Sequence, residues 1–229
     1  MVRTARLVAL LAVAGLAAVP AAPLGAQGTA QTVMVVPFNV HAAPRDDRDF
    51  AGVGSAIANL LATDLHAGGI QVVDEGPAAR TAALQPKSRG GMVGRKGAVD
   101  AAKLLGASHV VYGGFTADAT GNVRLDARAV NVATGAVEFT ERLQGRGDDV
   151  VAMLHQLASR LASGMSLTLA GGGAPTASLP LDALVTYGKG LEASDRGDRA
   201  QARQLLEGVV RDHPDFAPAK AALAASGTR

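Results

Sequence analysis

The chain has no cysteine and few aromatic residues. The absence of cysteine excludes a disulfide framework and thiolate metal sites. Aromatic residues make up 3% of the 229 residues, so we expect a core built mainly from valine, leucine, isoleucine and alanine. A chain of this length is long enough for one domain of ordinary size and a small additional unit.

The sequence also lacks a surplus of either charge outside its first residues. The formal net charge is +2, and Arg3 and Arg6 account for it, because the other 20 basic residues equal the 20 acidic ones in number. A balanced chain gives no argument for binding nucleic acid or an anionic membrane surface. We therefore expect no nucleic-acid partner.

The amino-terminal segment, residues 1–27, has the layout of a secretory signal peptide. Arg3 and Arg6 form a basic start, an apolar run extends over residues 7–19, and small residues follow. Pro20 interrupts the apolar run before it reaches the ~20 residues that a membrane-spanning helix needs. We therefore expect this segment to be cleaved during export rather than kept as a membrane anchor.

Export sets the expected compartment of the mature chain. In a bacterium with two membranes the protein would be periplasmic, and in a cell with one membrane it would be secreted. The chain has no cysteine to carry a bacterial lipid anchor, and we expect no integral membrane span after cleavage of the leader. The mature chain is therefore expected to be soluble.

Residues 28–168 show the pattern of an α/β (α+β) domain with a small mixed sheet and flanking helices. TVMVVPF (32–38) and IQVVD (70–74) are short apolar runs rich in β-branched residues, which predicts buried strands. A polar loop, HAAPRDDRD, follows the first run. Apolar residues then recur at helical spacing over residues 49–66, and a pair of glycines ends this helix.

The second half of this domain predicts an antiparallel meander and a closing helix. The runs SHVVYGGFTA, NVRLDARAVNV and AVEFTERLQG are separated by turns at Gly121 and Gly135, which predicts three consecutive strands. Residues 148–167 have one apolar face at helical spacing. We expect Asp148 or Asp149 to cap this helix, since an aspartate side chain can accept hydrogen bonds from the free N–H groups there.

The glycine-rich stretch RGGMVGRKGAVDAAKLLG, residues 89–106, invites comparison with a phosphate-binding loop. Such a loop needs a Gly-Lys-Ser/Thr string, but here Lys96 is followed by Gly97. A dinucleotide-binding fingerprint would have to follow a strand directly, and the preceding residues have no strand pattern. We therefore expect no nucleotide and no other cofactor, and a mobile loop over residues 85–97 that leads into a helix.

The order of these motifs resembles the TolB amino-terminal-like domain and the related domains of the curli secretion protein CsgG and the flagellar protein FlgO. The resemblance covers about residues 32–167 and rests on VMVVPF, IQVVD, AAKLLGASHVVYGGF and VATG. It implies an α/β domain that mediates envelope assembly or protein contact. It implies no catalytic residue, and it makes the segment before the short helix a variable loop. Asn131 and Phe139 stand where relatives often have Asp and Trp.

A glycine-rich linker, residues 169–178, separates this domain from a helical tail, residues 179–229. The tail resembles a degenerate tetratricopeptide repeat, which many relatives carry at this place. Counted back from Pro214 as the terminal proline of the repeat, Gly190 and Ala202 fall on the small positions and Leu206 on a large apolar one. The departures from the usual Trp, Leu and Tyr are Thr186, Lys189 and Ala193. A generic helical hairpin is the alternative interpretation.

Motifs for catalysis or metal binding are missing from the sequence. The five histidines are not spaced as metal ligands, and Ser55 does not stand in a Gly-x-Ser-x-Gly elbow. The aspartates near residue 46 and at 148–149 fit a solvated loop and a helix start. We therefore expect neither an enzyme nor a metal site.

The sequence as a whole predicts a non-enzymatic exported protein that contacts envelope proteins or further copies of itself. One repeat cannot bury its own apolar face, since about three are needed. The tail should therefore dock on the α/β domain or accept a partner through Leu184, Leu191, Leu206 and Val210. The alternative is a periplasmic small-ligand-binding or sensory module, in which the basic residues of the 85–97 loop, Lys87, Arg89, Arg95 and Lys96, close over an anion. A solvated loop is the simpler interpretation of those charges.

Overall fold

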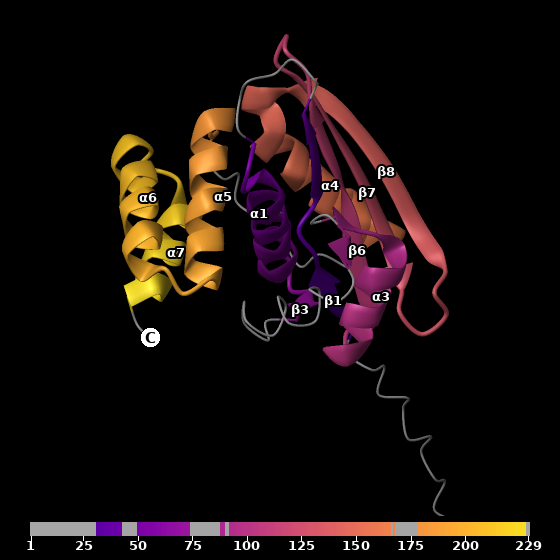
Figure 1. Cartoon of the computed structure of the whole chain (residues 1–229). Helices are drawn as coiled ribbons and strands as arrows, with labels where there is room; N and C mark the ends of the chain where they lie inside the picture. The colour runs from indigo at the N-terminus through magenta and orange to yellow at the C-terminus, as the bar shows by residue number, and fades with distance from the viewer. Residues whose placement is uncertain are drawn as a thin grey trace, which may run out of the picture.

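The computed structural model describes residues 31–42, 50–73, 88–89, 92–165, 167 and 178–227. A six-stranded mixed sheet with flanking helices is followed by a helical tail (Figure 1), which confirms the predicted α/β class. Within these ranges no helix combines the length and the apolar character that a membrane span requires. The predicted signal peptide and nearly all of the predicted linker lie outside the described residues, and the domain boundaries stay a prediction.

The sheet has the strand order β3–β1–β6–β7–β8, and β2 also pairs with β6. The strands β1, β2 and β3 run parallel to their neighbours, whereas β6, β7 and β8 form the predicted antiparallel meander. The strand bounds are β1 Thr32–Val35, β2 Asn39–Ala42, β3 Gln71–Val72, β6 His109–Ala117, β7 Asn122–Asn131 and β8 Val137–Arg146.

Strand β2 corrects the expectation that a polar loop begins directly after the first strand. Val33–Val35 pairs with His109–Val111, and Asn39–Ala42 pairs with Gly114–Ala117 further along the same strand. Pro37 interrupts the ladder between them because proline has no N–H to donate. The chain stays alongside β6 and resumes pairing, so the strand is longer than its apolar run.

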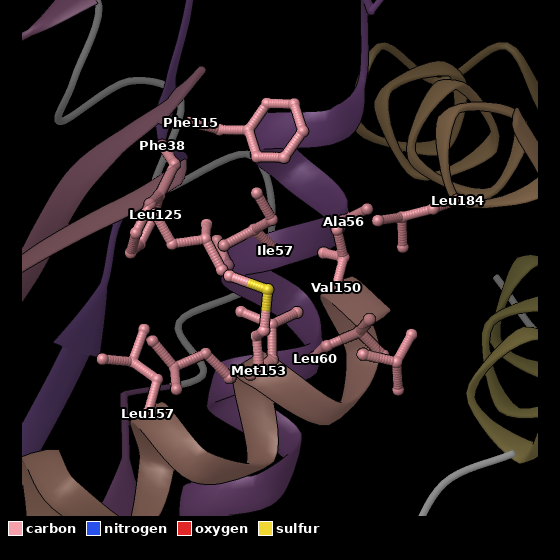
Figure 2. Packing of buried hydrophobic residues seen from close by; sticks show 14 of the residues in the cluster. Phe38, Ala56, Ile57, Leu60, Phe115, Leu125, Val150, Met153, Leu157 and Leu184 are labelled. Atoms are coloured by element: carbon pink, nitrogen blue, oxygen red, sulfur yellow. The ribbon is translucent and has the colours of Figure 1, made fainter. Parts of the chain in front are cut away.

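Helices cover the two faces of the sheet unequally. The α1 helix (Val53–Ala67) and α4 helix (Val150–Gly164) pack on one face and form the main core with it. The α3 helix (Arg95–Leu104) packs on the opposite face, against a smaller cluster that includes Val110 and Tyr112. Figure 2 shows side chains of the main core, among them Ile57, Leu60, Phe115, Leu125, Val150, Met153 and Leu157.

The start of α4 corrects the predicted aspartate cap. Asp149 occupies the position before the helix, but its side chain makes no capping hydrogen bond to α4. A short 3-10 turn, Gly147–Asp149, lies between β8 and α4. This turn directs the Asp149 carboxylate back to the strand end, where it accepts a hydrogen bond of 3.4 Å from the N–H of Arg146.

The predicted mobile loop over residues 85–97 is partly wrong. Ser88–Arg89 (β4) and Met92–Val93 (β5) form a short antiparallel pair, and α3 begins at Arg95. Lys96 therefore lies in the first turn of the helix, where it pairs with Asp100 at 3.3 Å, four residues on. This pairing of Lys and Asp on one helix face favours an earlier helix start. Lys87 lies outside the described residues.

The tail consists of α5 (Leu181–Asp195), α6 (Arg199–Asp212) and α7 (Ala217–Gly227). Helix α5 is continuous through Gly188 and Gly190. Figure 1 shows the tail helices stacked beside α1, with α5 in contact with both α1 and α6. The tail therefore docks on the α/β domain, which is one of the two outcomes that the sequence predicts.

Candidate functional site

The junction between α1 and α5 joins the tail to the α/β domain through close backbone contact. Gly52, at the start of α1, and Gly188, in the middle of α5, lie so close that a Cβ on either residue would overlap the backbone of the other helix. Beside this contact, the Ser55 hydroxyl donates a hydrogen bond of 3.0 Å to Glu192 Oε1. Small residues at the crossing allow the two helices to approach closely.

Tyr187 of α5 makes a second contact across the same junction. Its hydroxyl donates a hydrogen bond of 2.7 Å to Asn59 Oδ1 of α1. Its ring meets the buried ring of Phe216 edge-on, with centroids 5.3 Å apart, an arrangement that aromatic pairs favour. Burial raises the pKa of the Tyr187 phenol above its ordinary value. Tyr187 of α5 therefore contacts both α1 and the segment that leads into α7.

The four predicted partner-binding side chains lie in different environments. Leu184 and Leu206 have no exposed surface. Leu184 packs into the main core beside Ala56 (Figure 2). Leu191 and Val210 are partly buried against the same core. A partner that meets the folded chain can therefore reach Leu191 and Val210 more directly than Leu184, and the binding role of all four stays a prediction.

A groove of about 420 Å³ lies between α1, α5, the α5–α6 turn and α7. Leu191, Pro218, Ala221, Ala222 and Ala225 supply its accessible apolar lining, and the buried Tyr187 and Leu206 lie behind it. Polar groups also line it, namely Asn59, Thr63, Ser194, Asp195, Arg199 and Ser226. The groove exists only because α1 and the tail are held together, so it contains residues that are far apart in the sequence.

The packing inside the tail agrees with the positions assigned from the repeat pattern. A Cβ on Gly190 would lie 2.9 Å from Leu206 Cδ2, and Ala202 is completely buried. Small residues at Gly190 and Ala202 thus allow α5 and α6 to touch, and Leu206 fills the space beside them. This geometry fits a tetratricopeptide-like hairpin, and a generic helical hairpin with the same small residues would pack in the same way.

Ser108, His109 and Glu138 form a Ser–His–Glu array where the start of β6 meets the hairpin between β7 and β8, and the sequence patterns do not predict it. His109 Nδ1 lies 3.0 Å from Ser108 Oγ, and its Nε2 lies 3.0 Å from Glu138 Oε2. Asn131 donates a hydrogen bond of 3.0 Å to the same carboxylate. The turn at Thr134–Gly135 brings Asn131 and Glu138 together, and this turn was the available sequence signal.

The geometry of this array favours a structural role. The Ser108 hydroxyl accepts a hydrogen bond of 2.9 Å from the N–H of Thr32 and lies 3.0 Å from the Thr32 carbonyl oxygen. A nucleophilic serine needs a base positioned to take its proton and an open approach for the substrate. Here the hydroxyl bridges β6 to β1, and His109 is almost completely buried.

A second histidine pair links α4 to α1. His155 Nδ1 lies 2.6 Å from Asp64 Oδ2, with both side chains mostly buried. Burial raises the pKa of the Asp64 carboxyl, and the neighbouring His155 opposes this shift. No group of three or more histidine, aspartate or glutamate side chains gathers into a metal-binding arrangement in the described part of the chain. The pair therefore serves as a helix–helix contact.

No protein-family model and no curated protein matches the chain. Among solved structures, the LpoB C-terminal domain from Salmonella enterica aligns with 51% of this chain and 83% of its own, at 18% identity and a TM-score of 0.38. TolB from Acinetobacter baumannii aligns with 60% of this chain and 28% of its own length, at 16% identity and a TM-score of 0.40. The lipoprotein GNA1162 from Neisseria meningitidis aligns with 59% of this chain and 96% of its own length, at 16% identity and a TM-score of 0.39. Likenesses at this level say nothing of what this chain binds.

Proposed function

We propose that the protein is a non-enzymatic, exported accessory protein of the cell envelope that holds a segment of another protein in the groove between α1, α5 and α7. Three observations support this proposal: the leader-like start of the sequence, the sequence resemblance to TolB- and CsgG-like domains followed by a repeat, and the groove itself. The groove carries the proposal, because it is a concave surface shared by the domain and its tail.

The lining of the groove suggests what kind of segment it holds. Protein interfaces combine an apolar centre with a polar rim, and here the partly buried Leu191 lies among hydroxyl, amide and charged groups. The volume of about 420 Å³ accommodates a few side chains. We expect the partner to be a protein segment with an aliphatic side chain as its anchor, seated against Leu191.

The absence of enzymatic activity is part of the same proposal. The Ser–His–Glu array holds β1, β6 and β8 together through the bridging Ser108 hydroxyl. The groove contains Asp195 and Arg199 but no serine–histidine pair among its lining residues. These side chains therefore support a binding function without catalysis.

The test compares two exposed alanines of α7, of which only Ala221 lines the groove. Ala221→Glu places a carboxylate in the groove, and Ala224→Glu makes the same change on the same helix outside it. Mature protein with each substitution is used as bait for the envelope fraction beside the unchanged protein, and melting temperatures confirm folding.

We expect the same specific partner with unchanged protein and with Ala224→Glu, and its loss with Ala221→Glu. Equal capture by all three baits would show that the groove is not the binding site.

The volume of the groove also fits a small ligand, which makes a periplasmic ligand-binding module the second candidate. A small molecule that raises the melting temperature of Ala224→Glu but not of Ala221→Glu would favour that candidate.

A further inference from the structure

Arginines gather on the face of β7 and β8 that points away from α1 and α4. Val123, Leu125 and Ala127 of β7 belong to the main core, and side chains alternate between the two faces of a strand. The opposite face of β7 therefore carries Arg124, Asp126 and Arg128. By the same alternation around Leu143, the same face of β8 carries Thr140, Arg142, Gln144 and Arg146.

Positive charge exceeds negative charge on this face. Asp126 is the one acidic residue that β7 and β8 place there, and it pairs with Arg124 at 2.9 Å and with Arg142 at 2.6 Å. The acidic residues Glu138 and Glu141 of β8 bind His109 and Arg160 instead. The side chains of Arg124 and Arg142 are 45% and 60% exposed, so an acidic partner can reach both while they contact Asp126.

The register of the strands brings three of these arginines together. Arg124 lies opposite Gln144, between Arg142 and Arg146 on the neighbouring strand. Diagonal neighbours of this kind are ~7–8 Å apart. A hollow of about 530 Å³ at this end of the sheet is lined by Arg124, Gln144 and Arg146, together with Thr116, Asp118 and Asn122.

Helix α3 leaves this part of the sheet open. It packs on the same face, but against Val110, Tyr112 and Val130, towards the other end of β6 and β7. Figure 1 shows β8 as the outermost strand of the sheet, with no labelled element beside its outer edge. Among the described residues no strand pairs with the outer side of β8, so the arginines lie next to a free strand edge.

Strand β8 is an unusual edge. It has 10 residues, whereas β3 at the opposite edge has two. Proteins normally keep edge strands short or covered, because an edge strand has unpaired N–H and C=O groups that bind other strands. A long free edge beside a row of arginines combines main-chain and charge recognition.

We propose that β8 accepts an extended acidic segment of a partner protein as an additional strand, with alternate carboxylates of that segment facing Arg142, Arg146 and Arg124. Alternate residues of an added strand share one face, which matches the spacing of Arg142, Gln144 and Arg146. Guanidinium groups bind carboxylates through paired hydrogen bonds. This surface is separate from the groove, so either proposal can fail alone.

The chemistry of the surface favours carboxylates over nucleic acid. Proteins that bind single-stranded nucleic acid stack bases on exposed aromatic rings. The aromatic residues of β6 and β8 are Tyr112, Phe115 and Phe139, and each packs into or against a core cluster. The open face therefore has arginine side chains beside the edge of β8, and these three aromatic rings are not available there to stack on bases.

The test uses the mature chain and a fluorescent peptide of the length of β8, in which glutamate and threonine alternate. A peptide of alternating glutamine and threonine is the neutral control, and a glutamate peptide with an N-methyl group on every residue has no N–H groups with which to pair with β8. Binding is measured by anisotropy for the unchanged protein and for Arg146→Glu, Arg142→Glu/Arg146→Glu and Arg203→Glu. Arg203 is an exposed arginine of α6 and provides the matched control.

We expect the glutamate peptide to bind at least about tenfold more tightly than either control peptide, and the difference to shrink as salt rises. It should be lost with Arg142→Glu/Arg146→Glu, reduced with Arg146→Glu and unchanged with Arg203→Glu. Circular dichroism shows whether each variant is folded. If the double variant is unfolded, Arg146→Glu alone carries the test, because it retains the Arg142–Asp126 pair. Equal affinity for the glutamate and glutamine peptides, or for the N-methylated peptide, would overturn the proposal. So would tighter binding, through the same arginines, of a single-stranded oligonucleotide or of phosphatidylglycerol vesicles.

Discussion

Gly52 and Gly188 place the backbones of α1 and α5 in direct contact. A Cβ on Gly188 would overlap the carbonyl group of Gly52, and a Cβ on Gly52 would overlap the backbone between Gly188 and Lys189. Gly52 also has φ of 87°, a left-handed conformation that glycine adopts without steric cost. This contact sets the spacing of α1 and α5, and with it the shape of the groove.

We predict that Gly188→Ala destabilises the protein by about 1–3 kcal/mol or more, because an extra methyl group at a packed contact forces the helices apart. The measurement is the free energy of unfolding in urea. Gly208→Ala is the matched control, since a Cβ there would meet no atom nearer than 4.0 Å.

In the middle of α6, Gly208→Ala should stabilise the protein by about 0.5–1 kcal/mol, as expected for a helix position with space for a methyl group. If Gly188→Ala were also stabilising, the two helices would not be in contact in solution.

Tyr187 makes the stability of the protein sensitive to alkaline pH. Burial raises the pKa of its phenol above the ordinary value of 10.0. Above pH ~10 the phenol of the unfolded chain loses its proton while the folded one keeps it, so stability falls as pH rises. The contribution is fully present below pH ~10, and its loss is at most about 1.4 kcal/mol for each further pH unit.

Urea unfolding at about pH 9 and about pH 11 measures this loss, and Tyr187→Phe should reduce it because phenylalanine cannot ionise. At neutral pH, Tyr187→Phe should cost about 0.5–1.5 kcal/mol through the lost hydrogen bond to Asn59. The same pH dependence in Tyr187→Phe would assign the alkaline effect to other groups.

Asp118 organises the β6–β7 turn through hydrogen bonds to its carboxylate. The Thr120 hydroxyl donates one at 2.6 Å, the N–H groups of Thr120 and Asn122 donate at 2.9 and 3.0 Å, and the Asn122 amide donates at 3.1 Å. These bonds, that of Thr120 foremost, lower the pKa of Asp118 from 3.8 to about 2. The stabilising effect is present above pH 3.8 and is lost as pH falls through about 2.

We expect the Asp118 side-chain carbon to titrate near pH 2 in an NMR experiment. Thr120→Val removes the strongest donor and should raise this pKa towards 3.8. A midpoint that is the same in both proteins would contradict the role assigned to Thr120.

Ser108 should behave as a structural residue. Ser108→Ala removes the hydroxyl that bridges Thr32 and His109, and we expect a loss of about 1–3 kcal/mol in the free energy of unfolding. We also expect no labelling of Ser108 by a fluorophosphonate, a probe that reacts with activated serines. Labelling that is lost in Ser108→Ala and in His109→Gln would show a nucleophile and contradict the proposed absence of catalysis.

Much of the local structure could be predicted from the sequence. Alternation in NVRLDARAVNV identified β7, and helical spacing identified α1 and α4. These patterns depend on neighbours within a few residues, so one segment contains the whole signal. Strand β2 and the short 3-10 turn before α4 were not predicted, because pairing with β6 and the backbone of Gly147–Asp149 outweigh the local pattern.

The α/β class, the antiparallel meander and the small residues that let α5 and α6 pack follow from local patterns in the sequence. The position of the tail, and therefore the set of residues that form the groove, depends on tertiary packing. Tyr187 and Asn59 are 128 residues apart in the chain, and no local pattern encodes such a contact. The arginines of β7 and β8 likewise form one surface only when the strands pair in register. Local periodicity specifies which side of an element is apolar, whereas the packing of distant elements specifies what meets it.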